Sequence, residues 1–348
     1  LSESLPVDRQ ATLEHWLTLE NVYGALKRLR PLLGRAPGVL VASDLIELLY
    51  CYAYDPGKAV VQFLHGDFPY YYELARRHET VADAFITPSR AIERKLKALL
   101  PHRAPDVHYL PYGVPIPEFV RAPAGRGAPL RLLYSGRLWD DQKNIFALPE
   151  IDKLLVGRGA EVVWTIAGAG PDGAELERRF PPSDRVRYTG ALPNATLLRL
   201  MTEHDVFVLP TRGEGFPVAL LEAMSVGLVP VVSDIESGVP EIVNPETGWR
   251  PAVGDLEGFA AAIAKLASDR DLLETRSRAA RAKIVTEFDT RECVLAYHEL
   301  YARWDAFKRP WPGRRRVPFG SRLDRPWIPT AVTTAARRIV RGVKSGAR

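Results

Sequence analysis

Cysteine is scarce in this chain. Only Cys51 and Cys293 occur among 348 residues, far apart in the sequence and without metal-ligand partners nearby. A disulfide framework needs an even set of closely placed cysteines, and a structural zinc site needs several Cys or His ligands at short spacing. The sequence argues against both, so we expect no metal site and no disulfide. A reducing cytoplasm is the expected location.

Long apolar runs are lacking as well. The longest candidate, residues 38–54, is interrupted by Asp44 and Glu47, whereas a membrane-spanning helix needs about 18 or more apolar residues with few charges. We therefore expect a protein that does not cross a bilayer. The positively charged start and cleavage site of a signal peptide are also missing. Because the first residue is Leu and not Met, we expect the chain to begin partway into a longer protein.

The net charge of +5 is unevenly distributed. Residues 307–348 hold twelve Lys or Arg and the single acid Asp324, an excess of +11, which leaves 35 basic and 41 acidic residues before them. Trp311, Phe319 and Trp327 lie among these cations, a mixture suited to anionic lipid headgroups. This predicts peripheral contact with a membrane. The alternative is that the segment packs back on the first domain. Nucleic acid is a third reading, but no binding motif accompanies the charge.

Short apolar runs alternate with amphipathic segments of helix length, which is typical of an α/β protein with parallel sheets. With 46% apolar and 26% charged residues, 348 residues indicate two globular domains. In the first we expect strands at 38–42, 59–64, 84–87 and 107–110, and helices at 13–33, 71–80 and 89–99. Ser89 is placed to cap the last helix. The stretch 118–129, rich in Pro, Gly and Ala, is predicted to be an interdomain linker and hinge.

The alternation resumes after this stretch and predicts a second Rossmann-like domain. Its expected strands are 130–135, 161–167, 186–189, 206–209 and 229–233. Its expected helices are 144–155, 174–180, 194–203, 217–226, 256–267 and 269–285. A further helix, 290–306, is expected to bury Val294, Tyr297, Tyr301 and Trp304 on one side, and a basic helix is expected over 330–344.

The segment 210–217 follows an apolar strand and leads directly into a predicted helix with Pro217 at its first position. The free N–H groups at such a helix start suit a diphosphate. Ligands of open α/β sheets also bind at the carboxyl ends of strands. Glu214 lies in the loop and Glu222 inside the helix, so the two carboxylates are placed to reach different hydroxyl groups of one elongated ligand. Taken alone, the pattern also fits a solvated helix with surface acids.

Two cations follow the first strand of this domain. Arg137 comes directly after it in Ser135-Gly136-Arg137, and Lys143 precedes the next helix. Fixed positive charge beside a departing diphosphate lowers the barrier to its release, and would take the place of a metal ion. In isolation such residues are usually surface charges.

In order and spacing, these residues resemble family 4 retaining glycosyltransferases, which have the GT-B fold of two Rossmann-like domains facing a cleft. The resemblance covers about residues 130–304. Its most specific part is the Glu-x7-Glu element, Glu214 to Glu222. It is carried further by Arg137, Lys143, Gly168-Ala-Gly-Pro171, Gly190 and Gly238-Val-Pro-Glu241. The Glu-Gly-Phe-Pro variant is similar to members that build bacterial surface polysaccharides.

The resemblance implies a role for each of these residues. Arg137 and Lys143 would hold the donor diphosphate, Glu222 the ribose hydroxyls and Glu214 the transferred sugar. The rest of the donor site would come from Gly136, Gly190, Gly215, Phe216, Val218 and Ala219. The implied activity moves a sugar from a nucleoside diphosphate sugar to a glycan or glycolipid acceptor, with retention and without a metal or other cofactor.

The first domain carries a weaker part of the resemblance. Phe63-Leu64-His65-Gly66-Asp67 resembles the family's His-Gly-Asp segment, which implies that His65 faces the donor across the cleft as a catalytic residue; a structural hydrogen bond is the other reading. Tyr112 stands where the family usually has Asn, in a turn that we expect to be structural. The family's first strand and Gly-rich loop have no counterpart before residue 13. We therefore expect the first domain to be shortened at its N-terminus.

Two other functions fit parts of the sequence. Gly168, Gly170 and Gly173 match the G-x-G-x-x-G of a nicotinamide-dependent dehydrogenase, but no acid follows at the expected distance. A non-catalytic sugar-nucleotide or glycan-binding module of the same fold is the other alternative. We expect an acceptor-side domain over 1–128, a nucleotide-sugar-binding domain over 129–289, and a crossover helix with a basic tail over 290–348.

Overall fold

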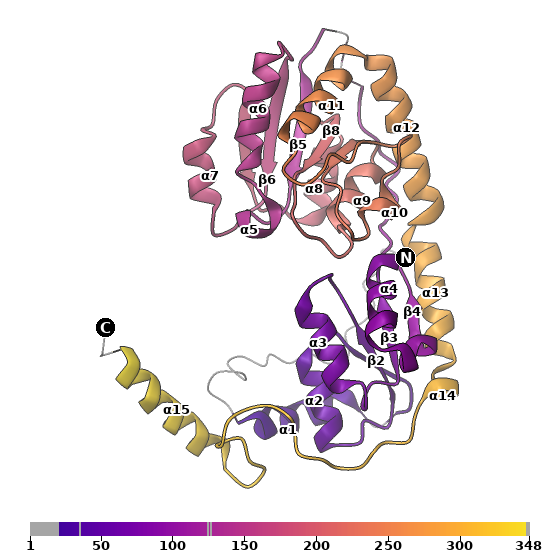
Figure 1. Cartoon of the computed structure of the whole chain (residues 1–348), viewed down its shortest axis with the longest axis vertical. Helices are drawn as coiled ribbons and strands as arrows, with labels where there is room; N and C mark the ends of the chain where they lie inside the picture. The colour runs from indigo at the N-terminus through magenta and orange to yellow at the C-terminus, as the bar shows by residue number, and fades with distance from the viewer. Residues whose placement is uncertain (1–20, 35, 124, 126, 346–348) are drawn as a thin grey trace.

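The computed structural model describes residues 21–345, apart from 35, 124 and 126. It contains two α/β domains, one above the other in Figure 1, each with its own parallel sheet. Two Rossmann-like domains facing a cleft are the fold expected from the sequence. Among the described residues, no helix is both long and apolar enough to span a membrane.

The sheet of the first domain has the order β1-β2-β3-β4, with all neighbouring strands parallel. Its strands are β1 (Val39–Ala42), β2 (Ala59–Phe63), β3 (Ala84–Thr87) and β4 (Val107–Tyr109). The helices are α1 (Val22–Leu33), α2 (Leu45–Ala53), α3 (Pro69–His78) and α4 (Arg90–Leu99), followed by the 3-10 helix η1 (Pro101–Asp106). The N-terminal part of the first expected helix, 13–20, lies outside the described residues.

Helix α2 was not anticipated from the sequence. The apolar run 38–54 contains strand β1 and then this helix, which begins where Asp44 accepts a hydrogen bond from the Leu45 amide at 2.7 Å. Asp44 followed three residues later by Glu47 is a recognisable helix-start pattern. By contrast, the expected cap of α4 is confirmed, because the Ser89 hydroxyl accepts from the Ile92 amide at 3.2 Å.

The second sheet has the order β7-β6-β5-β8-β9 and is also parallel. Its strands are β5 (Leu130–Ser135), β6 (Val162–Ala167), β7 (Val186–Gly190), β8 (Val206–Leu209) and β9 (Val229–Val232). Its helices are α5 (Asp140–Lys143), α6 (Ala147–Gly157), α7 (Gly173–Arg179), α8 (Asn194–Met201), α9 (Val218–Ser225), α10 (Val239–Ile242), α11 (Leu256–Ser268) and α12 (Arg270–Glu287). The strand order reverses between β5 and β8, which is where open α/β sheets bind ligands.

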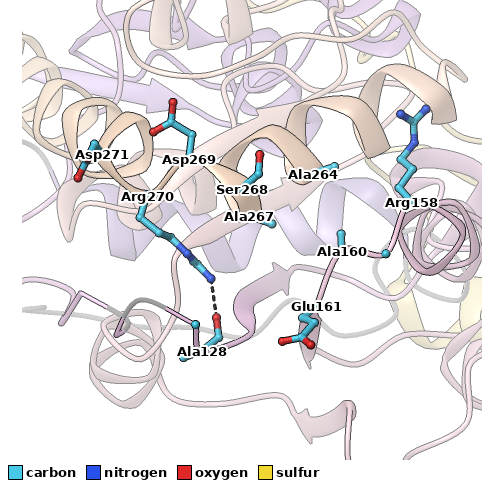
Figure 2. A pocket seen from close by; sticks show the side chains of 12 residues that line it. Ala128, Arg158, Ala160, Glu161, Ala264, Ala267, Ser268, Asp269, Arg270 and Asp271 are labelled. Carbon is cyan, nitrogen blue, oxygen red and sulfur yellow. Dashed lines mark hydrogen bonds between the residues drawn. The ribbon is translucent and has the colours of Figure 1, made fainter.

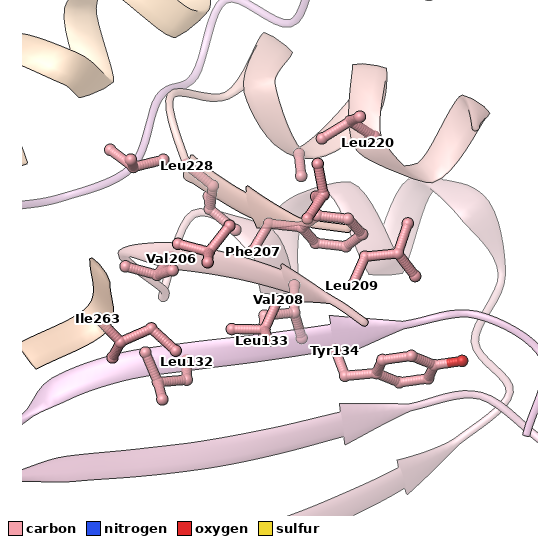
Figure 3. Close-up of a cluster of buried hydrophobic side chains, with 14 of the residues drawn as sticks. Leu132, Leu133, Tyr134, Val206, Phe207, Val208, Leu209, Leu220, Leu228 and Ile263 are labelled. Carbon is pink, nitrogen blue, oxygen red and sulfur yellow. The ribbon is translucent and has the colours of Figure 1, made fainter. Parts of the chain in front are cut away.

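The core of this domain lies around the two central strands, β5 and β8 (Figure 3). Figure 3 shows side chains from both strands meeting Leu220 of α9 and Ile263 of α11. Each is at most 1% exposed, and burying one such side chain contributes about 1.5–3 kcal/mol. This packing holds the carboxyl ends of β5 and β8, and the loops that follow them, in a rigid frame.

Three helix boundaries differ from expectation. The helix expected over 144–155 begins at Ala147, because α5 ends at Lys143 and the next residue, Asn144, takes a left-handed conformation at φ 51°. Pro217 is the residue before α9 and not its first helical residue. The helix expected over 290–306 is divided into α13 (Thr290–Ala302) and α14 (Trp304–Phe307). Val294, expected to be buried in it, is 49% exposed, and the fully packed positions are Cys293 and Leu300.

The stretch 118–129 does not act as a free linker. The Arg121 guanidinium is only 2% exposed and forms an ion pair with Asp205 at 2.7 Å and a hydrogen bond to Ser277 at 2.8 Å. Its third partner is Glu274. A buried charge needs such partners to offset its desolvation. They fasten the start of this stretch to the second domain, contrary to the prediction.

The chain crosses between the domains at two adjacent positions. The Val114 amide donates to the Phe288 carbonyl at 2.9 Å, and the Thr290 amide donates to the Val114 carbonyl at 3.0 Å. From there α13 runs beside the first domain, where the Tyr297 hydroxyl donates to the Leu110 carbonyl at 2.8 Å (Figure 1). These two crossings are the covalent connections across which the domains could move.

Most of the segment 307–329 packs on the first domain. The Trp311 indole donates to the Cys51 carbonyl at 2.7 Å, and Val317 is 3% exposed in the core of that domain, with Phe319 packed beside it. Trp311 and Phe319 are therefore not free to act as lipid anchors. For these two residues the structure favours the alternative prediction, that the segment packs back on the first domain. Trp327 remains 74% exposed. The final helix, α15 (Thr330–Ser345), confirms the expected basic helix.

A buried histidine makes the stability of the second domain sensitive to acid. His204 is 4% exposed; its Nδ1 lies 2.8 Å from the Leu200 carbonyl and its Nε2 2.8 Å from the Thr165 hydroxyl. A carbonyl can only accept, so Nδ1 carries a proton in either charge state of the ring. Burial lowers the pKa of His204 from 6.5 to about 4.

The folded protein therefore resists protonation of His204 while the unfolded chain accepts it, and stability falls as the pH drops from 6.5 to 4. The full effect of such a shift is about 3 kcal/mol. We expect His204→Asn to be less stable than the wild type at pH 7.5 but to lose less stability on acidification. Urea unfolding at several pH values measures how the free energy of unfolding of each protein changes with pH. The same change with pH in both proteins would contradict the role given to His204.

Candidate functional site

The predicted donor-site residues gather at the point where the strand order reverses. Gly136 and Arg137 follow β5, and residues 210–216 follow β8, the neighbouring strand. Because both strands end at the same edge of the sheet, the two loops lie side by side. The structure thus brings Arg137, Lys143 and Glu214 to one region of the second domain.

Lys143 and Glu214 form a direct ion pair. The Lys143 Nζ lies 2.6 Å from the Glu214 Oε1, and the side chains are 17% and 7% exposed. Charges this far removed from water must be paired, because the desolvation of either one alone is costly. The pair joins the two loops and shows that neither residue is an ordinary surface charge.

Further hydrogen bonds fasten the same two loops together. The Gln142 carbonyl accepts from the Thr211 hydroxyl at 2.9 Å and from the Arg212 amide at 2.8 Å, and the Gln142 side chain donates to the Gly213 carbonyl at 3.0 Å. The Arg212 guanidinium contacts Asp140 and the side-chain oxygen of Asn144. Arg212 thus braces the turn that carries Lys143. Arg212 was not among the residues predicted from the sequence, although its place two positions before Glu214 was a signal.

Arg137 lies at the junction of two hollows. One, of about 270 Å3, is lined by the loops after β5, β6 and β7, including Gly136, Gly168 and Leu192. The other, of about 630 Å3, lies between the domains and is lined by His65, Tyr70, Trp139 and Arg212, among others. The exposed Arg137 side chain contributes to both. It is placed to contact an elongated ligand that extends from one hollow into the other.

Glu222 lies in helix α9, away from the Lys143–Glu214 pair. Its Oε1 accepts a hydrogen bond from the Asn194 side chain at 2.6 Å. Burial raises the pKa of Glu222, while this hydrogen bond opposes the rise. Asn194 begins α8, shortly after Gly190, whose φ of 67° is one that favours glycine. The two predicted residues, Glu222 and Gly190, therefore border the same side of the domain.

The start of α9 is held by a buried aromatic ring. Phe216 is 4% exposed and packs against Tyr112 and Phe288, with ring centroids 6.2 and 5.6 Å apart. The Gly238 amide donates to the Gly215 carbonyl at 2.9 Å, and a Cβ at Gly238 would lie 2.1 Å from the Phe216 ring. Phe216 therefore anchors the helix start through its side chain. The backbone amides of Val218 and Ala219 lie in the first turn of α9, two and three residues after Phe216.

His65 lies across the cleft, on the first domain, as the sequence predicted. Its Nδ1 is 2.7 Å from the Tyr112 hydroxyl, and its ring stacks on Phe63 at 4.4 Å between centroids. Burial lowers the pKa of His65, with a smaller opposing effect from Asp44. The neutral ring is thus favoured. Tyr112, expected to be only structural, directly sets the orientation of this ring.

The domains touch closely between His65 and Glu214. A Cβ at Gly215 would lie 2.6 Å from both the Gly66 Cα and the His65 carbonyl oxygen, so only glycine allows this backbone contact. Ion pairs reinforce it nearby: Lys95 of the first domain lies 3.2 Å from Glu236 of the second. Figure 1 shows the two domains facing each other along this edge.

The glycines of the G-x-G-x-x-G match have a packing role. A Cβ at Gly168 would lie 1.9 Å from the Gly136 carbonyl oxygen, and one at Gly170 would lie 2.2 Å from the Leu138 carbonyl oxygen. These glycines let the loop after β6 lie directly on the loop after β5. The match therefore reflects backbone packing, and it does not support the dehydrogenase reading.

Another hollow, of about 650 Å3, lies at the opposite end of the second sheet (Figure 2). Ala128 and Glu161, which precede β5 and β6, line it together with the end of α11 and the start of α12. Figure 2 shows Arg270 reaching the Ala128 carbonyl there. Ligands of open parallel sheets bind at the carboxyl ends of the strands, so this hollow does not lie where the donor site is predicted.

Across the described residues, no three His, Cys, Asp or Glu side chains are grouped to hold a metal ion.

Comparison with known proteins agrees with this geometry. Residues 129–269 match the family model described as Glycosyl transferases group 1. The chain is 35% identical over 182 residues to the amylovoran biosynthesis glycosyltransferase AmsK of Erwinia amylovora, covering 49% of this chain and 44% of AmsK. It is 29% identical over 229 residues to a glycogen synthase of Mycobacterium tuberculosis, covering 63% and 54%. The chain thus spans about half the length of these relatives.

Solved structures share the fold over both domains. HepE of Anabaena, solved with UDP and glucose, superposes with a TM-score of 0.67 at 19% identity, covering 81% of this chain and 80% of HepE. Sucrose-phosphate synthase of Thermosynechococcus elongatus gives the same score and identity over 82% and 77%. The GT-B arrangement expected from the sequence is confirmed. Residues 129–269 form a Glycosyl transferases group 1 domain.

Proposed function

We propose that the protein is a glycosyltransferase that moves a sugar from a nucleoside diphosphate sugar to an acceptor hydroxyl group. The observation that carries the proposal is the largely buried Lys143–Glu214 pair beside Arg137, at the carboxyl ends of β5 and β8. Relatives named for polysaccharide synthesis, such as AmsK and the capsular polysaccharide glycosyltransferase CapM of Staphylococcus aureus, support an acceptor in cell-surface polysaccharide or glycolipid synthesis.

The chemistry follows from where charge develops. When the bond from sugar to diphosphate breaks, the departing oxygen becomes negative, and Arg137 and Lys143 stabilise it by preorganised positive charge. The Lys143 ammonium has three N–H donors, of which Glu214 takes one, so the others can face phosphate oxygens. The amides at the start of α9 add to this cradle. These protein groups supply the positive charge, and we propose that transfer needs no metal.

The two carboxylates divide the remaining work. Glu214, aligned by Lys143, accepts from hydroxyls of the transferred sugar, and Glu222 accepts from the ribose hydroxyls. The anomeric configuration is retained, and the departing phosphate oxygen takes the acceptor proton, so no side chain forms a covalent bond. His65, kept neutral by burial and oriented by Tyr112, polarises a hydroxyl from across the cleft.

We further propose that the reaction takes place in the cytoplasm, at the surface of a membrane, with contact through the basic tail. Its support is the charge of residues 307–348 and the exposure of Trp327. Peripheral attachment would hold the protein near lipid-linked acceptors.

Donor binding tests the function directly. A panel of UDP-, GDP- and ADP-sugars, screened by thermal shift and by release of nucleoside diphosphate, should identify at least one donor that binds below 1 mM, as is usual for enzyme substrates. Binding without release, even with acceptors present, would favour the non-catalytic module. No binding at any tested concentration would contradict the proposal.

Removing either cation should impair release of the diphosphate. We expect Arg137→Gln and Lys143→Gln to lower kcat/KM by about 100-fold or more, the usual effect of losing one preorganised charge-stabilising group. Lys153→Gln is the matched control, because Lys153 is 70% exposed and pairs with the exposed Glu150 on the same helix. The measurement is nucleoside diphosphate release at several donor concentrations. Equal activity of all three variants would contradict the assigned roles.

Closure of the cleft predicts a strict need for glycine at position 215. The added methyl group of Gly215→Ala would collide with the backbone of residues 65 and 66 and separate His65 from Glu214. A displacement of this size costs about 100-fold in rate. Gly213→Ala adds the same group 3.7 Å from the Phe68 ring, an ordinary contact. We expect Gly213→Ala to lower the rate several-fold less than Gly215→Ala does. Steady-state kinetics compare the two variants, and equal losses would argue against closure at this contact.

A further inference from the structure

A hollow of about 460 Å3 lies where α15 leaves the first domain. It is bordered by α1, by Tyr54 and Arg314, and by residues 326–330 at the start of α15. Among the described residues that line it, the charged ones are Lys27 and Arg314, and none is a carboxylate. Both side chains are exposed, and within the described part of the chain neither forms an ion pair. The hollow is thus a positively charged site for an anion.

The residues around this hollow are firmly held. The Asn21 side chain donates to the Ile328 carbonyl at 2.9 Å and to the Arg325 carbonyl at 3.1 Å. The buried Asp324 accepts from the Val22 amide at 2.9 Å and pairs with Arg337 of α15. These contacts tie the start of α15 to the start of α1. The helix therefore has a defined direction relative to the hollow.

Exposed apolar side chains surround the same site. Trp327, which lines the hollow, is 74% exposed, and on α15 Val332 is 54% and Ile339 is 68% exposed. Figure 1 shows α15 extending away from both domains, and among the described helices and strands none packs along its length. An amphipathic helix with basic and apolar sides, next to an exposed tryptophan, is suited to the interface of a bilayer.

We propose that this face docks on an anionic phospholipid bilayer, with a headgroup phosphate in the hollow between Lys27 and Arg314 and with α15 lying in the interface. The excess of +11 in residues 307–348 complements a negatively charged leaflet. Trp327, Val332 and Ile339 enter the headgroup layer, where their apolar surface leaves water. The inference deepens the membrane contact proposed above, and rests on it, by naming the lipid chemistry and the site.

A nucleic acid would satisfy the charge but not the apolar surface. Phosphate contacts with a polyanion bind Lys and Arg and leave aliphatic side chains in water. Val332 and Ile339 have no base-stacking ring and would remain exposed in such a complex. A lipid surface accounts for both features at once, and is therefore the favoured occupant.

Vesicle flotation of the full chain tests the proposal. We expect binding to vesicles of phosphatidylcholine with 30% phosphatidylglycerol and at least tenfold weaker binding to pure phosphatidylcholine. Equal flotation with both compositions, or none with either, would overturn it. Fluorescence anisotropy with a single-stranded oligonucleotide is the third arm. Tighter binding to the oligonucleotide than to the anionic vesicles would also overturn it.

Matched variants separate the hollow from general attraction. Lys27→Gln with Arg314→Gln removes two charges from the hollow, and Arg316→Gln with Arg322→Gln removes two charges from the C-terminal tail outside the hollow. We expect the first pair to weaken vesicle binding at least fivefold more than the second. Equal weakening would overturn the headgroup site. Ile339→Gln should weaken binding without altering charge, and an unchanged affinity would overturn the insertion of α15.

Nucleoside diphosphate release from a soluble donor distinguishes this proposal from the proposed function. We expect the Lys27 and Arg314 variant to keep the wild-type rate without vesicles, because neither residue lies in the cleft. A protein that binds vesicles but releases no diphosphate would leave the docking face supported and contradict the glycosyltransferase. Normal diphosphate release without vesicle binding would support the glycosyltransferase and contradict the docking face. Circular dichroism confirms that each variant is folded.

Discussion

The ion pair between Lys143 and Glu214 is the interaction on which the proposed donor site depends. It joins two loops that are 71 residues apart in sequence and adjacent in space because β5 and β8 are neighbours in the sheet. A lysine and a glutamate this far from water stabilise each other, and either one alone would carry an uncompensated desolvation cost. Arg212 and Gln142 add hydrogen bonds between the same loops, so the pair is held in one place.

The second domain alone does not complete the cleft. The contact between Gly66 and Gly215 brings the backbone of the first domain against the loop that carries Glu214. His65 lines the hollow between the domains, and its hydrogen bond with Tyr112 orients its ring. The chain crosses between the domains at 112–114 and 288–290, beside this contact. Small rotations of the backbone at these crossings would open or close the cleft, while the loops of the proposed donor site stay fixed to each other. The geometry of the proposed site and the arrangement of the domains are therefore coupled where Gly215 meets residues 65 and 66.

Much of the architecture was predictable because it depends on local pattern. Apolar runs bounded by loops placed all nine described strands within a residue or two, and the hydroxyl of Ser89 marked the start of α4. The errors arose where a local pattern has two readings. The apolar run 38–54 contains a strand and a helix, and a Pro- and Gly-rich stretch is either a free linker or, as at Arg121, a segment fastened by distant charges.

Local sequence was enough to predict the alternation of strands and helices, the offset between Glu214 and Glu222, and the excess of positive charge at the C-terminus, because each is a property of residues close together in the chain. Only the tertiary structure decided that Lys143 pairs with Glu214, that Tyr112 orients His65, and that Trp311 is occupied while Trp327 is exposed. These contacts join residues tens to hundreds of positions apart. Which of them form depends on strand order and domain packing, and no local spacing records either.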